Sequence, residues 1–87
     1  MRDLRELRVE IDEIDRKITE LYKRRTDIAG EVAEYKKKSG KPVFDKAREE
    51  EKLSVLSRLG ETPFQKDSIH ELFQQIMEIG RASCRER

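Results

Sequence analysis

Three basic residues, Arg8, Arg25 and Lys36, fall on one face of the helix that the first part of the sequence predicts. With about 100° of rotation per residue, they lie within about a quarter turn of one another. Arg25 and Lys36 are about 16 Å apart along the helix axis, so two long side chains can converge on one small anion. Arg8 lies about 25 Å from Arg25 and cannot share a metabolite-sized ligand with it in one subunit. In an antiparallel dimer, Arg8 of the partner subunit could complete the site, which predicts a composite anion pocket.

Arg25 stands out because it interrupts the apolar stripe of the same helix. The stripe steps alternately by three and four residues, and its other members are all apolar: Leu4, Leu7, Ile11, Ile14, Ile18, Leu21, Ile28, Val32 and Tyr35. A guanidinium in such a stripe is costly to bury unless an anion meets it. Both a bound ligand and a structural ion pair satisfy this requirement. The other basic residues of the helix, such as Arg16, are expected to be solvated or paired with acidic neighbours.

Asp45, Arg48 and Glu49 form a second charged group, at the start of a shorter predicted helix. Asp45 has the residue type and position of an N-cap, and Arg48 could pair with its carboxylate. Glu49 in the first turn is favourable for the helix dipole in any case. Helix capping and ion pairing are the simpler explanation of these three charged residues. A role in a ligand pocket is the alternative.

The composition limits the partners of the chain. Its 87 residues make one domain at most, and with 34% hydrophobic residues and no Trp a single copy buries little apolar surface, so oligomerisation is expected. Its 20 basic and 19 acidic residues give a net charge of +1, which predicts no general attraction to nucleic acid or to an anionic membrane. No apolar run is long enough to span a bilayer and no signal peptide is evident, so a cytoplasmic protein is expected.

The residue types and their spacing do not favour metal or thiol chemistry. Cys84 is the sole cysteine and has neither a ligand cluster nor a nearby base, and His70 lacks a partner at the spacing of a catalytic dyad. No glycine-rich phosphate loop or metal-ligand spacing occurs. We expect neither a metal nor a cofactor.

Three helices, long, short and medium, are expected to position the charged residues, and the predicted fold class is all-α. The first runs from about residue 3 to 38 and ends before Gly40 and Pro42. The second runs from about residue 46 to 59, and the third begins near Pro63 after a capping box. The side of the third helix that we expect to be buried comprises Ile69, Leu72, Phe73, Ile76 and Met77.

The first helix is too long for a compact subunit of this size. It measures roughly 50 Å, whereas a globule of this chain length is about 30 Å across. Its apolar stripe therefore needs a partner outside the subunit. The simplest closed arrangement is a two-fold dimer in which the long helices pack against each other and against shorter helices.

The order of these residues resembles the all-helical chorismate mutase family. The matching motifs are Leu7-Arg8, Asp15, Arg24-Arg25, Glu31-Val32, Lys36, Lys41-Pro42-Val43 and Asp45-x-x-Arg48-Glu49. The resemblance covers about residues 4 to 78, and the intervals between the charged residues match without gaps. It implies an intertwined homodimer of three-helix subunits that converts chorismate to prephenate without a cofactor. Such an enzyme would serve phenylalanine and tyrosine biosynthesis in the shikimate pathway.

The resemblance also implies a role for each charged residue. Arg25, with Arg8 from the other subunit, would clamp the two carboxylates of chorismate through the fork geometry of arginine. Lys36 would bridge a carboxylate and the ether oxygen, and Glu49 would accept a hydrogen bond from the ring hydroxyl. Catalysis would rest on Lys36, Arg25 and Glu49. The full substrate-binding set would be Arg8, Arg25, Lys36, Asp45, Arg48 and Glu49.

Two family positions on the third helix are degenerate in this chain. The family places a serine there and, one turn further, a glutamine or glutamate, and the matching positions are Gly80 and Cys84. The tail, residues 79–87, reads like the translation of a common DNA-sequencing adapter. We expect a chorismate mutase domain over residues 1–78 and a non-native tail after it, with activity weakened by the altered end.

Two other functions fit part of the pattern. A pyruvate lyase acting on isochorismate shares the fold and the carboxylate clamp, although Lys36 and the Asp45-x-x-Arg48-Glu49 group favour the mutase. A non-catalytic antiparallel helical dimerisation module would use the stripe for structure alone, with Arg25 paired to a glutamate across the seam.

Overall fold

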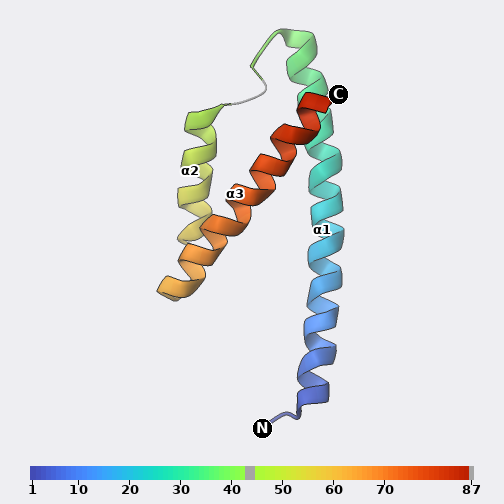
Figure 1. Cartoon of the computed structure of the whole chain (residues 1–87), viewed down its shortest axis with the longest axis vertical. Coiled ribbons are helices and arrows are strands. Elements are labelled where there is room, and N and C mark those ends of the chain that lie inside the picture. The colour runs from blue at the N-terminus through green and yellow to red at the C-terminus, as the bar shows by residue number, and fades with distance from the viewer. Residues whose placement is uncertain (43–44, 87) are drawn as a thin grey trace. The chain divides into compact units, whose positions relative to one another are not determined.

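The computed structural model describes residues 1–42 and 45–86, with the backbone alone for residues 84–86. Its helices are α1 (Leu4–Ser39), α2 (Lys46–Ser57) and α3 (Pro63–Glu86), and the described residues contain no strand (Figure 1). The predicted all-α class with long, short and medium helices is confirmed. Val43 of the predicted motif and Arg87 of the predicted tail lie outside the described residues.

Local signals set the two ends of α1. The Asp3 carboxylate accepts a hydrogen bond of 2.9 Å from the Glu6 backbone N–H and caps the first turn. At the other end, Gly40 takes the left-handed conformation with φ of +75°, and the Lys41 N–H donates to the Lys36 carbonyl over 3.0 Å. This closing bond is that of a Schellman motif. The helix therefore stops where the sequence places its glycine.

Capping bonds also set the starts of α2 and α3. Asp45 Oδ1 accepts a hydrogen bond of 3.1 Å from the Arg48 backbone N–H. Thr62 Oγ1 accepts from the Gln65 N–H at 3.1 Å, while Gln65 Oε1 accepts from the Thr62 N–H at 3.4 Å and from the Glu61 N–H at 2.9 Å. The predicted N-cap and the predicted capping box are both confirmed.

The second helix ends at Ser57, before the predicted Leu59. The Leu59 N–H donates to the Leu56 carbonyl over 3.1 Å, so the chain tightens into a turn instead of continuing the α-helix. Gly60 then permits a close approach, because a Cβ at this position would lie 2.8 Å from the backbone nitrogen of Lys66.

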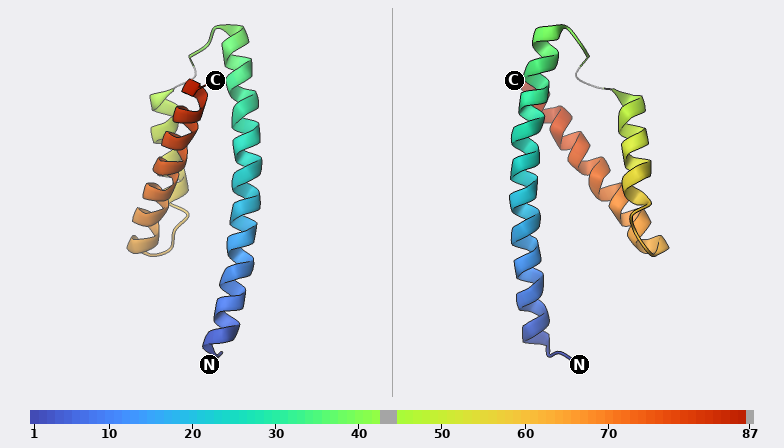
Figure 2. Two further views of the ribbon diagram at one scale, coloured as in Figure 1. Left: turned by 45° about the vertical axis from the view of Figure 1, so that its right-hand side comes forward. Right: turned by 180° about the vertical axis from the view of Figure 1, so that it is seen from behind.

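The chain divides into two compact units, Met1–Glu31 and Val32–Arg87. The second contains α2 and α3, which run antiparallel, meet near the turn that joins them and diverge toward the start of α2 (Figure 1, Figure 2). Among its described residues, the buried apolar side chains are those of Leu53, 9% exposed, and Met77, 7% exposed. Leu72, expected on the buried side of α3, is 54% exposed, so this part of the prediction is wrong for a single chain.

The first unit is most of α1, whose apolar stripe stays exposed in a single chain. Ile11, Ile18 and Ile28 keep 55%, 56% and 54% of their surface accessible. A row of mostly exposed aliphatic side chains along one helix is typical of an interaction face. Across the described residues, none of the helices combines the length and the apolar character that crossing a membrane requires.

Candidate active site

The predicted cations of the first helix lie on one continuous element at the expected spacing. Arg8, Arg25 and Lys36 all belong to α1; the first is exposed and the other two are half-buried. Among the described residues, neither Arg8 nor Arg25 has an ion pair. The structural ion pair considered for Arg25 is therefore not formed within the described part of a single chain.

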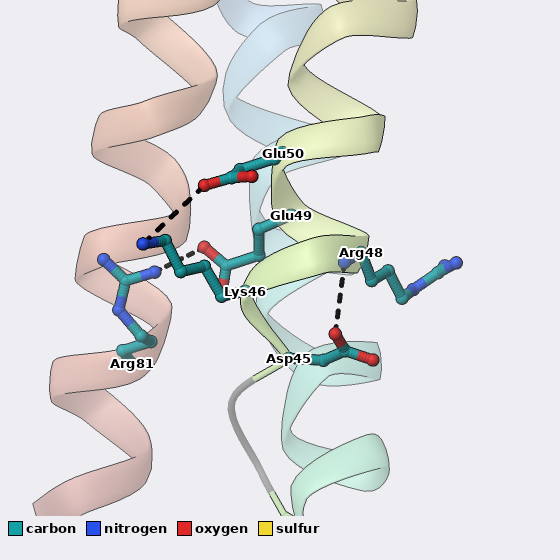
Figure 3. A network of polar contacts seen from close by, with 6 residues as sticks. All are labelled: Asp45, Lys46, Arg48, Glu49, Glu50 and Arg81. Carbon is teal, nitrogen blue, oxygen red and sulfur yellow. Dashed lines mark hydrogen bonds and ion pairs between the residues drawn. The ribbon is translucent and has the colours of Figure 1, made fainter.

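The first turn of α2 directs its charged side chains to different sides (Figure 3). Asp45 is exposed and uses its carboxylate to cap the helix, through the backbone N–H of Arg48. The Arg48 side chain is exposed and extends away from α3. The expected ion pair between Asp45 and Arg48 is wrong for the described residues, because the carboxylate bonds the backbone instead. Glu49 points toward α3 and is half-buried.

Glu49 meets Arg81 of the third helix. Arg81 Nη1 donates a charge-assisted hydrogen bond to Glu49 Oε1, and their side chains are 29% and 24% exposed. The neighbouring Lys46–Glu50 pair, separated by 3.9 Å, is 77% and 66% exposed. Water screens the half-buried Glu49–Arg81 pair less than the exposed Lys46–Glu50 pair. Among the ion pairs of the described residues, the one between Glu49 and Arg81 alone joins two helices.

Arg81 is absent from the predicted site residues, although its position carries a usable signal. It follows the buried Met77 by four residues on α3, and Glu49 precedes the buried Leu53 by four residues on α2. This spacing places each charge on the apolar side of its helix. The criterion that singled out Arg25, a guanidinium in an apolar stripe, would have found Arg81 as well.

The two degenerate positions lie in the last turns of α3. Gly80 is half-buried, and among the described residues a Cβ built on it meets no side chain and no other element within 4 Å, so these residues leave room for a Cβ there. Cys84 belongs to the helix but lies outside the residues whose side chains are described. Position 80 therefore offers no hydroxyl to a ligand, as the sequence indicated.

The described charged residues suit anion binding. Arginine forks and lysine bind carboxylates, and a glutamate accepts hydrogen bonds from hydroxyl groups. Within the part of the chain that the structure describes, no group of three or more His, Cys, Asp or Glu side chains could hold a metal ion. These residue types suit a small carboxylate ligand that also carries a hydroxyl.

Comparison with known proteins identifies the family. The sequence profile described as chorismate mutase type II matches residues 7–83. The form II structure of chorismate mutase from Thermus thermophilus is similar with a TM-score of 0.88 and 28% identity, over 97% of this chain and 96% of that one. The form I structure gives a TM-score of 0.82 and 31% identity, over 88% and 96% of the two chains. No curated protein matches the sequence.

The family match and the likeness in fold both extend over most of the chain. The matched residues reach Ser83, and α3 continues to Glu86. The boundary between residues 78 and 79 expected from the sequence stays a prediction. On the sequence match and the shared fold together, the chain belongs to the chorismate mutase type II family.

Proposed function

We propose that this isomerase of the chorismate mutase family converts chorismate to prephenate in pockets that draw residues from both subunits of a homodimer. The reaction is an intramolecular rearrangement in which an ether carbon–oxygen bond breaks while a carbon–carbon bond forms, and no atom is gained or lost. It requires no nucleophile and no proton transfer. The protein has to hold the substrate folded and to stabilise the negative charge that grows on the ether oxygen.

The cations of α1 supply both effects. Arg25, together with Arg8 of the partner subunit, clamps the two carboxylates of the substrate through forked hydrogen bonds. Lys36 bridges a carboxylate and the ether oxygen, where its interaction strengthens as the bond breaks. The observation that carries the proposal is the placement of Arg25 and Lys36, both half-buried on one continuous helix and about 16 Å apart along its axis.

The start of α2 supplies the other end of the pocket. Glu49 accepts a hydrogen bond from the ring hydroxyl, and Asp45 and Arg48 border the same region. The half-burial of Glu49 supports this role, because water competes less for a partly covered carboxylate. The capping bond of Asp45 supports it indirectly by fixing where the helix begins.

A second copy of the chain covers the apolar stripe of α1 in this proposal. The support is the exposure of its aliphatic side chains, such as Ile11 at 55% and Ile18 at 56%. Each such side chain contributes on the order of 1 kcal/mol when it is covered. Antiparallel packing brings the start of one helix beside the middle of the other. The cytoplasmic location and the place in the shikimate pathway stay predictions.

Lys36→Ala tests the proposal, with Lys37→Ala, at an exposed neighbouring position, as the matched control. Chorismate loss is followed by absorbance, the product is identified by chromatography, and the oligomeric state is measured by light scattering. Lys36→Ala should lower kcat by about a hundredfold or more and leave a dimer. Lys37→Ala should stay within about twofold of the unaltered protein. An active Lys36→Ala protein would contradict the proposal, and pyruvate in place of prephenate would assign the lyase reaction instead.

A further inference from the structure

Arg81 and Glu49 connect the last turns of α3 to the first turn of α2, at the end where the two helices diverge (Figure 1, Figure 3). We infer that Arg81 is a positioning residue, which holds the Glu49 carboxylate in the orientation that accepts the ring hydroxyl of the substrate. The inference rests on the proposed function, since Glu49 has this task only if the chain binds chorismate. Arg81 acts through Glu49 and does not touch the substrate.

The pattern of bonds leaves Glu49 able to bind a ligand. Arg81 Nη1 bonds to Oε1, and among the described residues Oε2 has no hydrogen-bond partner. A carboxylate offers about four acceptor positions over its two oxygens. One oxygen can therefore stay bound to the guanidinium while the other accepts a hydrogen bond from a hydroxyl group.

Holding the Glu49 carboxylate in place matters because a glutamate side chain is long and flexible. A free glutamate loses rotamer freedom when it binds a ligand, and this loss weakens binding. The bond to Arg81 imposes the restraint before the ligand arrives. Burial makes the restraint effective, since the Glu49 side chain is 24% exposed whereas that of Glu50, the next residue, is 66% exposed. Of the two carboxylates, Glu49 is the one held in place.

A purely structural link between α2 and α3 is the competing role for the pair. It predicts lower stability after the loss of Arg81, but no change in which ligand groups the site recognises. Positioning predicts a change that concerns the ring hydroxyl alone. Two stable cyclic dicarboxylates, one with a ring hydroxyl and one with hydrogen in its place, separate the two roles.

Titration calorimetry measures the affinity of both dicarboxylates for the full-length dimer and its variants. In the unaltered protein, the hydroxyl should improve affinity by about tenfold or more. Arg81→Met should reduce this preference below about threefold without changing the affinity for the ligand that lacks the hydroxyl. Arg81→Lys should keep part of the preference, because lysine retains the charge and a donor. Lys46→Met is the matched control and should keep all of it, because the pair that it removes is exposed.

Glu49→Gln is the last variant, and it distinguishes a failure of the inference about Arg81 from a failure of the proposed function. A full hydroxyl preference in Arg81→Met would overturn the inference and leave Arg81 as a helix link. A stronger preference in that variant would also overturn it, since Arg81 would then compete with the ligand. If Glu49→Gln loses the preference while Arg81→Met keeps it, the proposed function stands and the inference alone fails. If the unaltered dimer binds neither dicarboxylate, the proposed function fails and the inference fails with it.

Discussion

Mixed dimers test whether each site draws on both chains. Arg8 and Arg25 lie on one continuous helix, about 25 Å apart along its axis, so they cannot clamp one small dianion from the same chain. If the site uses Arg8 of the partner subunit, Arg8→Ala and Lys36→Ala on different chains of one dimer act on the same pocket. That pocket lacks both side chains, and the other pocket lacks neither.

The size of the expected effect follows from the contacts that each change removes. Loss of a forked arginine–carboxylate contact, or of the donor at the ether oxygen, costs about 3 kcal/mol and lowers kcat/KM by about a hundredfold. Each parent dimer, altered in both chains, should show this loss. A mixed dimer has one intact pocket and should keep about half of the unaltered activity. The mixed dimer should therefore exceed either parent by roughly fiftyfold.

Co-expression of the two chains with different affinity tags yields the mixed dimer after two successive purifications, and the absorbance assay measures chorismate loss. Arg25→Ala combined with Lys36→Ala is the matched control, because in the proposed site both residues belong to the pocket of their own chain. That control dimer has no intact pocket and should be as inactive as its parents. A mixed Arg8→Ala and Lys36→Ala dimer without activity, or recovery in the control, would refute the placement of Arg8 in the partner's site.

Other expected outcomes concern the third helix and the turns around α2. Gly80→Ser with Cys84→Gln should raise kcat in the chorismate assay by about tenfold or more, because it introduces at these positions the donors that the resemblance implies. No increase would show that these donors do not limit the reaction. Gly60→Ala should lower the free energy of unfolding in urea by about 1–3 kcal/mol, because the new Cβ would lie 2.8 Å from the backbone nitrogen of Lys66. Unchanged stability would mean that the turn relaxes to accommodate the methyl group. Asp45→Ala should lower the free energy of unfolding by about 1 kcal/mol, and Asp45→Ser should lower it by less, because serine can still cap a helix. Equal losses in the two variants would argue against the cap.

The sequence predicts the helices well because the signals that delimit them are local. The caps at Asp45 and Thr62 and the left-handed Gly40 act through atoms only a few residues away, so residue type and spacing suffice. The same holds for the cations of α1, since a continuous helix determines the axial distances between its residues. The early end of α2 at Ser57 marks the limit, because a tighter turn competes there with one more α-helical turn.

Contacts between helices depend on more than spacing. Glu49 and Arg81 are 32 residues apart and meet because α2 and α3 pack antiparallel in one particular way. The periodicity of each helix indicates which side faces inward, but it does not indicate which residues meet across the interface. Leu72 shows the same limit, because its exposure depends on what packs against α3. A role for Arg8 depends on a second chain altogether.

Arg25 and Arg81 carry the same sequence signal and differ in their counter-ions. Each is a half-buried guanidinium on the apolar side of a helix. Arg81 meets Glu49 within its own chain, whereas Arg25 has no ion pair among the described residues. A half-buried guanidinium without a counter-ion among the described residues gains more from an anion supplied from outside than a guanidinium that is already paired. Arg81 is therefore used to order a carboxylate of the protein, and Arg25 remains available to a carboxylate that the chain itself does not contain.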